Sequence, residues 1–149
     1  MALPLVLVAD SRVERRLCVI AALSGGADLH AVDPRADRLL REVRTRAPAL
    51  VVIGEERDGR AIALARALRT DLRAGVRVVL YGDGGRARLP RWSHGEPPPD
   101  AWVADPRDGA TLEDAVRAVL AGETRWPAVS PPAESLLVRA LGRLRRASM

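Results

Sequence analysis

Residues 49–54 read Ala-Leu-Val-Val-Ile-Gly, a short and unbroken apolar run that follows Pro48. A run of this length and composition predicts a strand that is buried on both faces of a parallel sheet. Residues 3–9 form a second such run, Leu-Pro-Leu-Val-Leu-Val-Ala, which ends at Asp10 and Ser11. Strands of this kind require helices on both faces of the sheet.

The rest of the chain alternates between strand-like runs and segments in which apolar residues recur every three or four positions. Such alternation predicts a parallel sheet joined by right-handed crossovers. Five strands in 149 residues favour a flavodoxin-like three-layer α/β sandwich of strand order 2-1-3-4-5 over a six-stranded Rossmann sheet. The predicted strands are 3–9, 27–32, 49–54, 76–81 and 101–104, and the predicted helices are 12–24, 34–46, 58–73 and 111–120.

Three details of these elements are specific enough to be checked. The start of the last predicted helix is indicated by Thr111 and the acidic residues that follow it. Residues 82–100 are rich in Gly, Pro and Arg, so we expect a long loop with a degenerate fourth helix of at most one turn. The inward face of the helix over 12–24 is predicted to be Val13, Leu17, Ile20, Ala21 and Ser24.

The carboxyl-terminal part, residues 125–149, is predicted to be a linker followed by an amphipathic helix over 131–146. An isolated helix of this length is marginal in water, so its apolar stripe must dock on its own domain (1–124) or on another chain. A helix packed across a twofold axis would give a homodimer. The stripe consists of Leu136, Leu137, Ala140, Leu141 and Leu144.

Composition excludes several classes of chemistry. All 24 basic residues are arginine and the net charge is +5, so no lysine is present for a Schiff base or a P-loop. The single Cys18 rules out an internal disulfide framework, and we expect it to be a small buried apolar residue. No apolar run approaches the roughly 20 residues of a membrane span, and the start lacks a signal-peptide pattern, so we expect a cytoplasmic protein.

Four segments together resemble the receiver domain of bacterial response regulators, the signalling proteins of two-component systems. The resemblance covers roughly residues 3–122 and implies the flavodoxin-like fold. It rests on strand-end register and on helix order rather than on an intact set of motifs. The segments are Val6-Leu7-Val8-Ala9-Asp10, Ala47-Pro48-Ala49-Leu50-Val51-Val52-Ile53, Val76-Arg77-Val78-Val79-Leu80-Tyr81 and Ala101-Trp102-Val103-Ala104-Asp105-Pro106.

The resemblance also implies where the family's phosphorylation chemistry would stand. The carboxylate pair that holds Mg²⁺ in receivers is reduced to Asp10 and Ser11. The phosphorylated aspartate corresponds to Gly54, the switch Ser or Thr to Gly82, and the lysine that neutralises the acyl phosphate to Asp105. Phosphoryl transfer needs a nucleophile, a cation with oxygen ligands and a positive group, so the resemblance implies a pseudo-receiver without phosphorylation.

Two neighbouring residues complete this degenerate phosphorylation pocket. Glu55 follows Gly54, but a shift of one residue turns its side chain to the other face if strand geometry persists. Pro106 stands where the family has a proline after its lysine, and the resemblance implies that Asp105–Pro106 is cis. Asp10 with Glu55 could form a residual divalent-cation site; the alternative is a helix-capping Asp10 and a solvated Glu55.

No enzyme constellation, cofactor site or metal site is indicated. His30 and His94 lack matching ligands, so we expect surface or strand-end roles for them. Trp92 and Trp102 either anchor a protein partner or pack beneath the long loop. Further candidates for contact with a partner are the tail residues Leu137, Leu141 and Leu144.

We therefore expect a non-enzymatic signalling or scaffold module that acts through protein–protein contacts, as a homodimer. Two alternatives stay open. One is binding of a nucleotide or phosphorylated metabolite at the strand ends, where glycines at 54, 82, 84 and 85 leave room. The other is weak, salt-sensitive DNA binding through Arg143, Arg145 and Arg146 of the tail.

Overall fold

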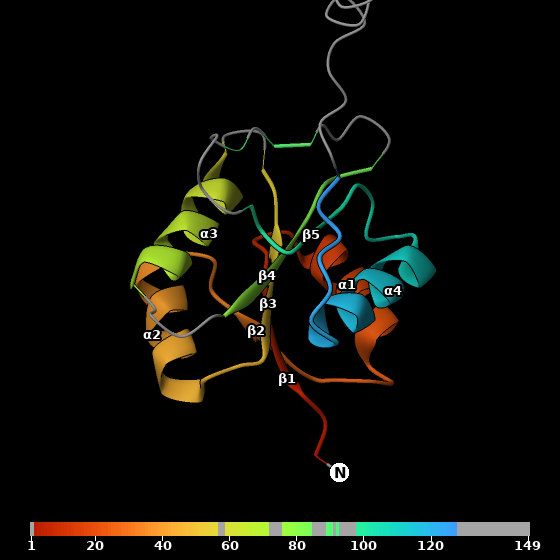
Figure 1. The fold of residues 1–149 in the computed structure, drawn as a ribbon, viewed down its shortest axis with the longest axis horizontal. Helices are drawn as coiled ribbons and strands as arrows, with labels where there is room; N and C mark the ends of the chain where they lie inside the picture. The colour runs from red at the N-terminus through yellow and green to blue at the C-terminus, as the bar shows by residue number, and fades with distance from the viewer. Residues whose placement is uncertain are drawn as a thin grey trace, which may run out of the picture.

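The computed structural model describes residues 2–56, 59–71, 76–84, 89–90, 92 and 98–127. They form one five-stranded parallel sheet with helices on both faces, as predicted (Figure 1). The strand order is β2-β1-β3-β4-β5, which confirms the flavodoxin-like sandwich. The strands are β1 (Leu5–Ala9), β2 (Asp28–Val32), β3 (Leu50–Gly54), β4 (Arg77–Tyr81) and β5 (Ala101–Val103), and the helices are α1 (Val13–Leu23), α2 (Ala36–Arg46), α3 (Arg60–Asp71) and α4 (Gly109–Leu120).

The two runs that predicted the fold lie side by side in the middle of the sheet. Strands β1 and β3 pair in parallel, with register partners that run from Val6↔Leu50 to Ala9↔Ile53. Alternate side chains of both strands enter two separate cores, one beneath α1 and α4 and the other beneath α2 and α3. The carboxyl ends of β1 and β3 therefore meet at one rim of the sheet.

The buried face of α1 differs from the prediction. Val13 and Leu17, which the apolar spacing places inward, are 55% and 58% exposed. Arg15, Val19 and Leu23 are buried instead. The prediction was wrong for Val13 and Leu17, whereas Ile20 packs against the core. Arg15 is buried because its guanidinium has a buried carboxylate partner, Asp10.

The start of α4 also differs from the prediction. The helix begins at Gly109, two residues before Thr111, and Asp108 is its N-cap. The Asp108 carboxylate accepts hydrogen bonds from the Thr111 amide at 3.2 Å and from the Thr111 hydroxyl at 2.7 Å. Thr111 is thus the third residue of the helix, where it completes the cap.

The edge of the sheet at β5 is joined by a segment predicted to be only a linker. Arg125 forms an isolated parallel bridge with Ala101, and Trp126 packs against the α2–α3 core. The described residues of the 82–100 connection contain no helix. Leu72 and the predicted helix over 131–146, with Leu137, Leu141 and Leu144, lie outside the described residues. Within the described part, no helix is long and apolar enough to cross a membrane.

Candidate functional site

The degenerate phosphorylation pocket predicted from the sequence maps to the carboxyl rim of the sheet. Asp10 follows β1, Gly54 ends β3, Gly82 follows β4 and Asp105 lies two residues after β5. The Asp10 carboxylate lies against Gly54. Gly82 is buried, and its N–H donates a hydrogen bond to the Val103 carbonyl. The rim is thus built from the loops that the sequence indicated.

Asp10 is the centre of this rim and is only 1% exposed. Its carboxylate accepts hydrogen bonds from Arg15 Nε at 2.7 Å, Arg15 Nη2 at 2.9 Å, the Tyr81 hydroxyl at 2.7 Å and the Arg12 amide at 2.9 Å. The bond to the Arg12 amide forms a local turn before α1, whose N-cap is Arg12 without a side-chain cap. The expected helix-capping role of Asp10 was therefore wrong, because the carboxylate turns inward to Arg15.

Arg15 comes from the first turn of α1 and is only 6% exposed. Besides its two bonds to Asp10, its Nη1 donates to the Glu55 carbonyl at 2.9 Å. Its guanidinium also lies over the Tyr81 ring, 5.4 Å from the ring centroid. Asp10, Arg15 and Tyr81, here called the rim cluster, thus connect the ends of β1, β3 and β4.

Gly54 provides the space that the rim cluster occupies. A Cβ atom at this position would lie 2.5 Å from Asp10 Oδ2 and 2.7 Å from Arg15 Nη2. Both distances are shorter than a van der Waals contact, so no side chain fits at position 54 without displacing the ion pair. The position that the receiver resemblance assigns to the phosphorylated aspartate is filled by the chain's own side chains.

The protonation of the rim cluster follows from its contacts. Burial favours the neutral form of Asp10, but hydrogen bonds from Arg15, the Arg12 amide and Tyr81 outweigh burial and lower the pKa of Asp10. Burial likewise opposes the charged form of Arg15, and its hydrogen bond to Asp10 nevertheless raises the Arg15 pKa. Burial and then the charge of Asp10 raise the pKa of Tyr81 far above its ordinary value. The cluster is a charged pair with a neutral phenol.

A second set of contacts ties the outer loops together. Arg12 pairs with Asp83 at 2.5 Å, and Arg107 donates to the Asp83 carbonyl at 3.1 Å. Arg107 also pairs with Asp105 at 2.9 Å, and its hydrogen bonds lower the pKa of Asp105. Asp105, which the receiver resemblance aligns with a lysine, is therefore an ionised carboxylate with its own cation.

The remaining residues of the predicted pocket lie nearby. Ser11 is exposed and its hydroxyl donates to Glu56. The Glu55 side chain is half-buried, not solvated as expected, and the Glu55 backbone carbonyl accepts a hydrogen bond from Arg15. Pro106 is buried, and the Asp105–Pro106 bond is trans, so the prediction of a cis bond was wrong. For an X–Pro bond trans is favoured by roughly 0.5–1 kcal/mol when nothing enforces cis.

No metal centre is formed by the described residues, in which no three His, Cys, Asp or Glu side chains are grouped suitably. The Asp10 carboxylate is saturated by four donors, which leaves it no free lone pair for a cation. Cys18 is half-buried on α1, and His30 lies on β2 with its Nε2 3.2 Å from Asp28. His94 lies outside the described residues.

Trp92 and Trp102 pack against the core of their own chain. Both are half-buried and pack against the α2–α3 core together with Trp126. The Trp92 and Trp126 rings meet edge to face with centroids 6.4 Å apart. They lie on the same side of the sheet as α2 and α3.

Arg15 and Tyr81 are the site residues that sequence reasoning missed. Tyr81 is the sole tyrosine and ends a buried strand, which is where a polar group can reach the rim. Arg15, Val19 and Leu23 share the four-residue spacing of one helical face, but an arginine on that face is ordinarily interpreted as exposed. Only a carboxylate at the end of β1 gives it a reason to be buried.

The chain matches no protein-family model and none of the curated proteins. Its structure is similar to the signal receiver domain of the response regulator NarL from Mycobacterium tuberculosis, with a TM-score of 0.60 and 20% identity over 83% of this chain and 100% of that one. It is also similar to the methanol:cobalamin methyltransferase complex MtaBC from Methanosarcina barkeri, with a TM-score of 0.55 and 15% identity over 82% of this chain and 48% of that one.

A third structure, the pseudo-receiver domain of the CikA protein, aligns with a TM-score of 0.46 and 15% identity over 93% of this chain and 95% of that one. The likeness to the NarL receiver domain establishes a receiver-like fold.

Proposed function

We propose that this chain is a receiver-like signalling module that does not accept a phosphoryl group and acts through protein–protein contacts as a homodimer. The observation that carries the proposal is the contact between Gly54 and the rim cluster. A Cβ at Gly54 would collide with Asp10 Oδ2 at 2.5 Å, so an acceptor side chain and the buried ion pair exclude each other.

The chemistry of the rim agrees with this proposal. Phosphoryl transfer needs a nucleophile, a cation held by oxygen ligands and a positive group near the developing charge. Gly54 has no nucleophile, and the Asp10 carboxylate already accepts bonds from four donors. Asp105 places a negative charge where a receiver needs a positive one.

Internal ion pairs and hydrogen bonds join the rim loops to one another. Arg15 joins the ends of β1 and β3 through Asp10 and the Glu55 carbonyl. Asp83 joins the β1–α1 loop to the β5–α4 loop through Arg12 and Arg107. In our proposal these internal contacts replace a bound phosphoryl group, and the module's output depends on shape and surface.

We propose that the surface for protein–protein contact lies on α1. Val13 and Leu17 lie one helical turn apart and are among the three large apolar side chains exposed in the described part of the chain. Neighbouring apolar side chains that are exposed together are candidates for an interaction surface. Because identical surfaces pair across a twofold axis, a second copy is the partner that we propose.

The phosphorylation half of the proposal is tested by incubating the protein with acetyl phosphate and Mg²⁺ and measuring its intact mass. An authentic receiver domain treated in parallel is the positive control. We expect the mass to stay unchanged while the control gains one phosphoryl group. A stoichiometric gain on this chain would contradict the proposal.

The dimer half is tested by sedimentation of the protein and of the variant Val13→Ser/Leu17→Ser. Leu3→Ser is the matched control, because Leu3 is 53% exposed but precedes β1 rather than lying on α1. We expect a dimer mass for the wild type and the control and a monomer mass for the α1 variant. A monomeric wild type at micromolar concentration would refute the dimer.

A second candidate function is small-ligand binding at the strand ends. A cavity of about 440 Å³ opens there between α2 and α3, with Ser11, Gly54 and Glu56 in its wall. It lies outside the carboxyl ends of β1 and β3, where open α/β sheets commonly bind ligands. A thermal-shift screen with nucleotides and phosphorylated metabolites tests it, and an unchanged Tm throughout would count against it.

A further inference from the structure

Strand β2 forms one edge of the sheet. It pairs with β1 on one side, in a register that covers all five of its residues without a bulge. At the opposite edge, Arg125 forms a bridge with Ala101 of β5. Strand β2 contains no proline, so it lacks two of the devices that keep an edge from pairing with another chain. Its outer side can therefore accept a further strand.

The backbone of β2 presents Leu29 and Ala31 to the outside. The Asp28 amide donates to the Pro4 carbonyl at 2.9 Å, so the backbone of Asp28 faces β1. Successive residues of a strand alternate in direction, so the N–H and C=O groups of Leu29 and Ala31 point away from the sheet. Within the described part of the chain, no residue forms a hydrogen bond with these outward groups.

The side chains of β2 also divide between two faces. Leu29 packs on the core beneath α1 and α4, whereas Val32 belongs to the core beneath α2 and α3. Because side chains alternate along a strand, Asp28 and His30 lie on the α2 face with Val32. Their side chains are 59% and 43% exposed, and His30 Nε2 lies 3.2 Å from Asp28 Oδ1. The edge thus carries a carboxylate and an imidazole two residues apart.

That spacing is complementary to itself. When two antiparallel copies of β2 pair about a twofold axis at Leu29, Asp28 of each copy lies opposite His30 of the other. The two Leu29 residues then exchange both backbone hydrogen bonds, and the flanking pairs are of the kind whose side chains approach most closely. A carboxylate accepts and an imidazole N–H donates, so both flanking pairs are favourable. An axis at His30 would instead place Asp28 opposite Val32.

The exposed apolar side chains of α1 lie on the side of that helix toward the β2 edge. A Cβ on Gly109 of α4 would meet Ala22 Cβ at 3.4 Å, so Ala22 faces α4. Val13 precedes Ala22 by about two and a half helical turns, so it points away from α4, and Leu17 lies one turn from Val13. Because α4 packs on β4 and β5 and α1 on β1 and β2, the direction away from α4 leads to β2 (Figure 1).

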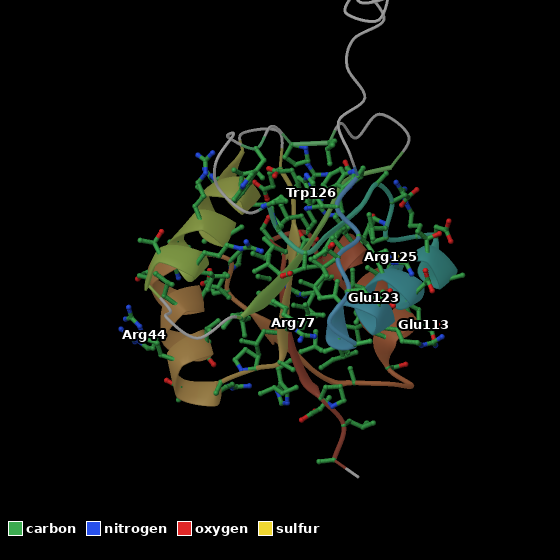
Figure 2. The ribbon with its side chains drawn as sticks, in the orientation of Figure 1. Arg44, Arg77, Glu113, Glu123, Arg125 and Trp126 are labelled. Carbon is green, nitrogen blue, oxygen red and sulfur yellow. The ribbon has the colours of Figure 1, made fainter. Side chains whose placement is uncertain are left out.

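The neighbouring helices do not share this apolar surface. Arg44 projects outward from α2 and Glu113 from α4, and both side chains are exposed (Figure 2). In the described part of the chain, Val13 and Leu17 are the large apolar side chains that a helix exposes. A second copy paired with β2 would bring its α1 beside the first α1 on the same face of the sheet and cover them.

We propose that the two copies of the dimer join their sheets through β2, antiparallel about an axis at Leu29, with Val13 and Leu17 of both α1 helices covering one face of the junction. The homodimer proposed above is the premise, and the β2 junction gives it a register. Asp28 and His30 specify that register, because other axes separate them from their partners in the second copy.

Disulfide cross-linking of the full chain in a Cys18→Ser background tests the register. Asp28→Cys and His30→Cys are made in separate proteins, which are mixed under mild oxidation. We expect a disulfide-linked heterodimer, because the Cα atoms of such facing residues are about 4.5 Å apart. Each protein alone is the matched control, since its two cysteines lie on a diagonal of about 7–8 Å, which a disulfide does not span without backbone movement.

Sedimentation of charge variants is a second measurement that requires no cysteine. His30→Asp places four carboxylates together at the junction, so we expect dimerisation to weaken roughly tenfold or more. Asp28→His/His30→Asp exchanges the two residues and restores opposite partners, so we expect the dimer to return. Circular dichroism of both variants shows that they are folded.

The possible failures can be told apart. A dimer mass without a cross-link in the mixture would refute the β2 junction and leave the homodimer in place, and so would an exchanged variant that stays dissociated. Cross-linking of His30→Cys alone as fast as the mixture would place the axis at residue 30 and overturn the register. A monomeric wild type would refute the junction and the homodimer together.

Discussion

Asp10 and Arg15 form a bidentate ion pair inside the protein, with Nε to Oδ2 at 2.7 Å and Nη2 to Oδ1 at 2.9 Å. The two residues lie only five positions apart, one at the end of β1 and the other in the first turn of α1. Their pairing determines which face of α1 is buried and leaves no room for a side chain at position 54.

Gly54→Ala tests the space beside the ion pair. The new Cβ would lie 2.5 Å from Asp10 Oδ2, so we expect a loss of about 1–3 kcal/mol in the free energy of unfolding. Gly25→Ala is the control, because a Cβ there meets nothing within 4 Å, and its effect should stay within about 0.5 kcal/mol. Urea denaturation measures both. Equal urea midpoints for Gly54→Ala and Gly25→Ala would show that the side chains beside Gly54 move to accept a methyl group at little cost.

Substitutions at Asp10 and Arg15 test whether the two residues act as a unit. Removing one partner of a buried pair leaves an uncompensated charge, so Asp10→Asn and Arg15→Met should each cost about 3–5 kcal/mol. The double variant should lose clearly less than the sum of the single losses. Arg15→Lys should not restore stability, because an ammonium cannot make the bidentate contact. Additive losses in a double-mutant cycle would contradict the coupling.

The lowered pKa of Asp10 predicts an acid-dependent contribution to stability. Its folded pKa lies below its unfolded value of about 3.9, so the contribution is present above that pH and disappears as the pH falls through the folded pKa. Urea midpoints of the wild type and Asp10→Asn should differ most near neutral pH and converge in acid. A difference that is constant with pH would refute an ionised Asp10.

Tyr81 gives the corresponding prediction in alkali. Its folded pKa is raised, so its contribution is complete below the unfolded value of about 10 and is lost as the pH rises above it. Tyr81 is the only tyrosine, so tyrosinate absorbance reports on it alone. We expect the signal to rise together with unfolding followed by circular dichroism. A signal that precedes unfolding would show that the phenol is accessible in the native state.

Local sequence patterns were sufficient for the arrangement of strands and helices. The run over 49–54 became β3, Leu50–Gly54, because consecutive apolar residues are stable only with both faces covered. The helix over 34–46 became α2, with Leu39 and Val43 buried at the predicted spacing. The rim location of Asp10, Gly54, Gly82 and Asp105 followed from strand ends alone, since parallel strands bring their carboxyl ends together.

The chemistry of the rim was not accessible in the same way. The presence of Asp10 and the absence of a side chain at Gly54 can be read from the sequence. Arg15 fills the space beside Gly54, and Tyr81 donates to the Asp10 carboxylate that Arg15 also contacts. These contacts depend on side chains from α1 and β4 that meet only after the sheet forms. Apolar periodicity scores an arginine as exposed, whereas a buried carboxylate partner reverses that preference.

The sequence by itself thus determined the sheet, its order and the absence of a side chain at position 54, because these depend on hydrophobic periodicity and residue identity. Tertiary structure alone decided that the Asp10–Arg15 ion pair fills the space beside Gly54 and that Val13 and Leu17 face outward. Pairing energies depend on distances between side chains remote along the chain, and a one-dimensional pattern does not contain those distances.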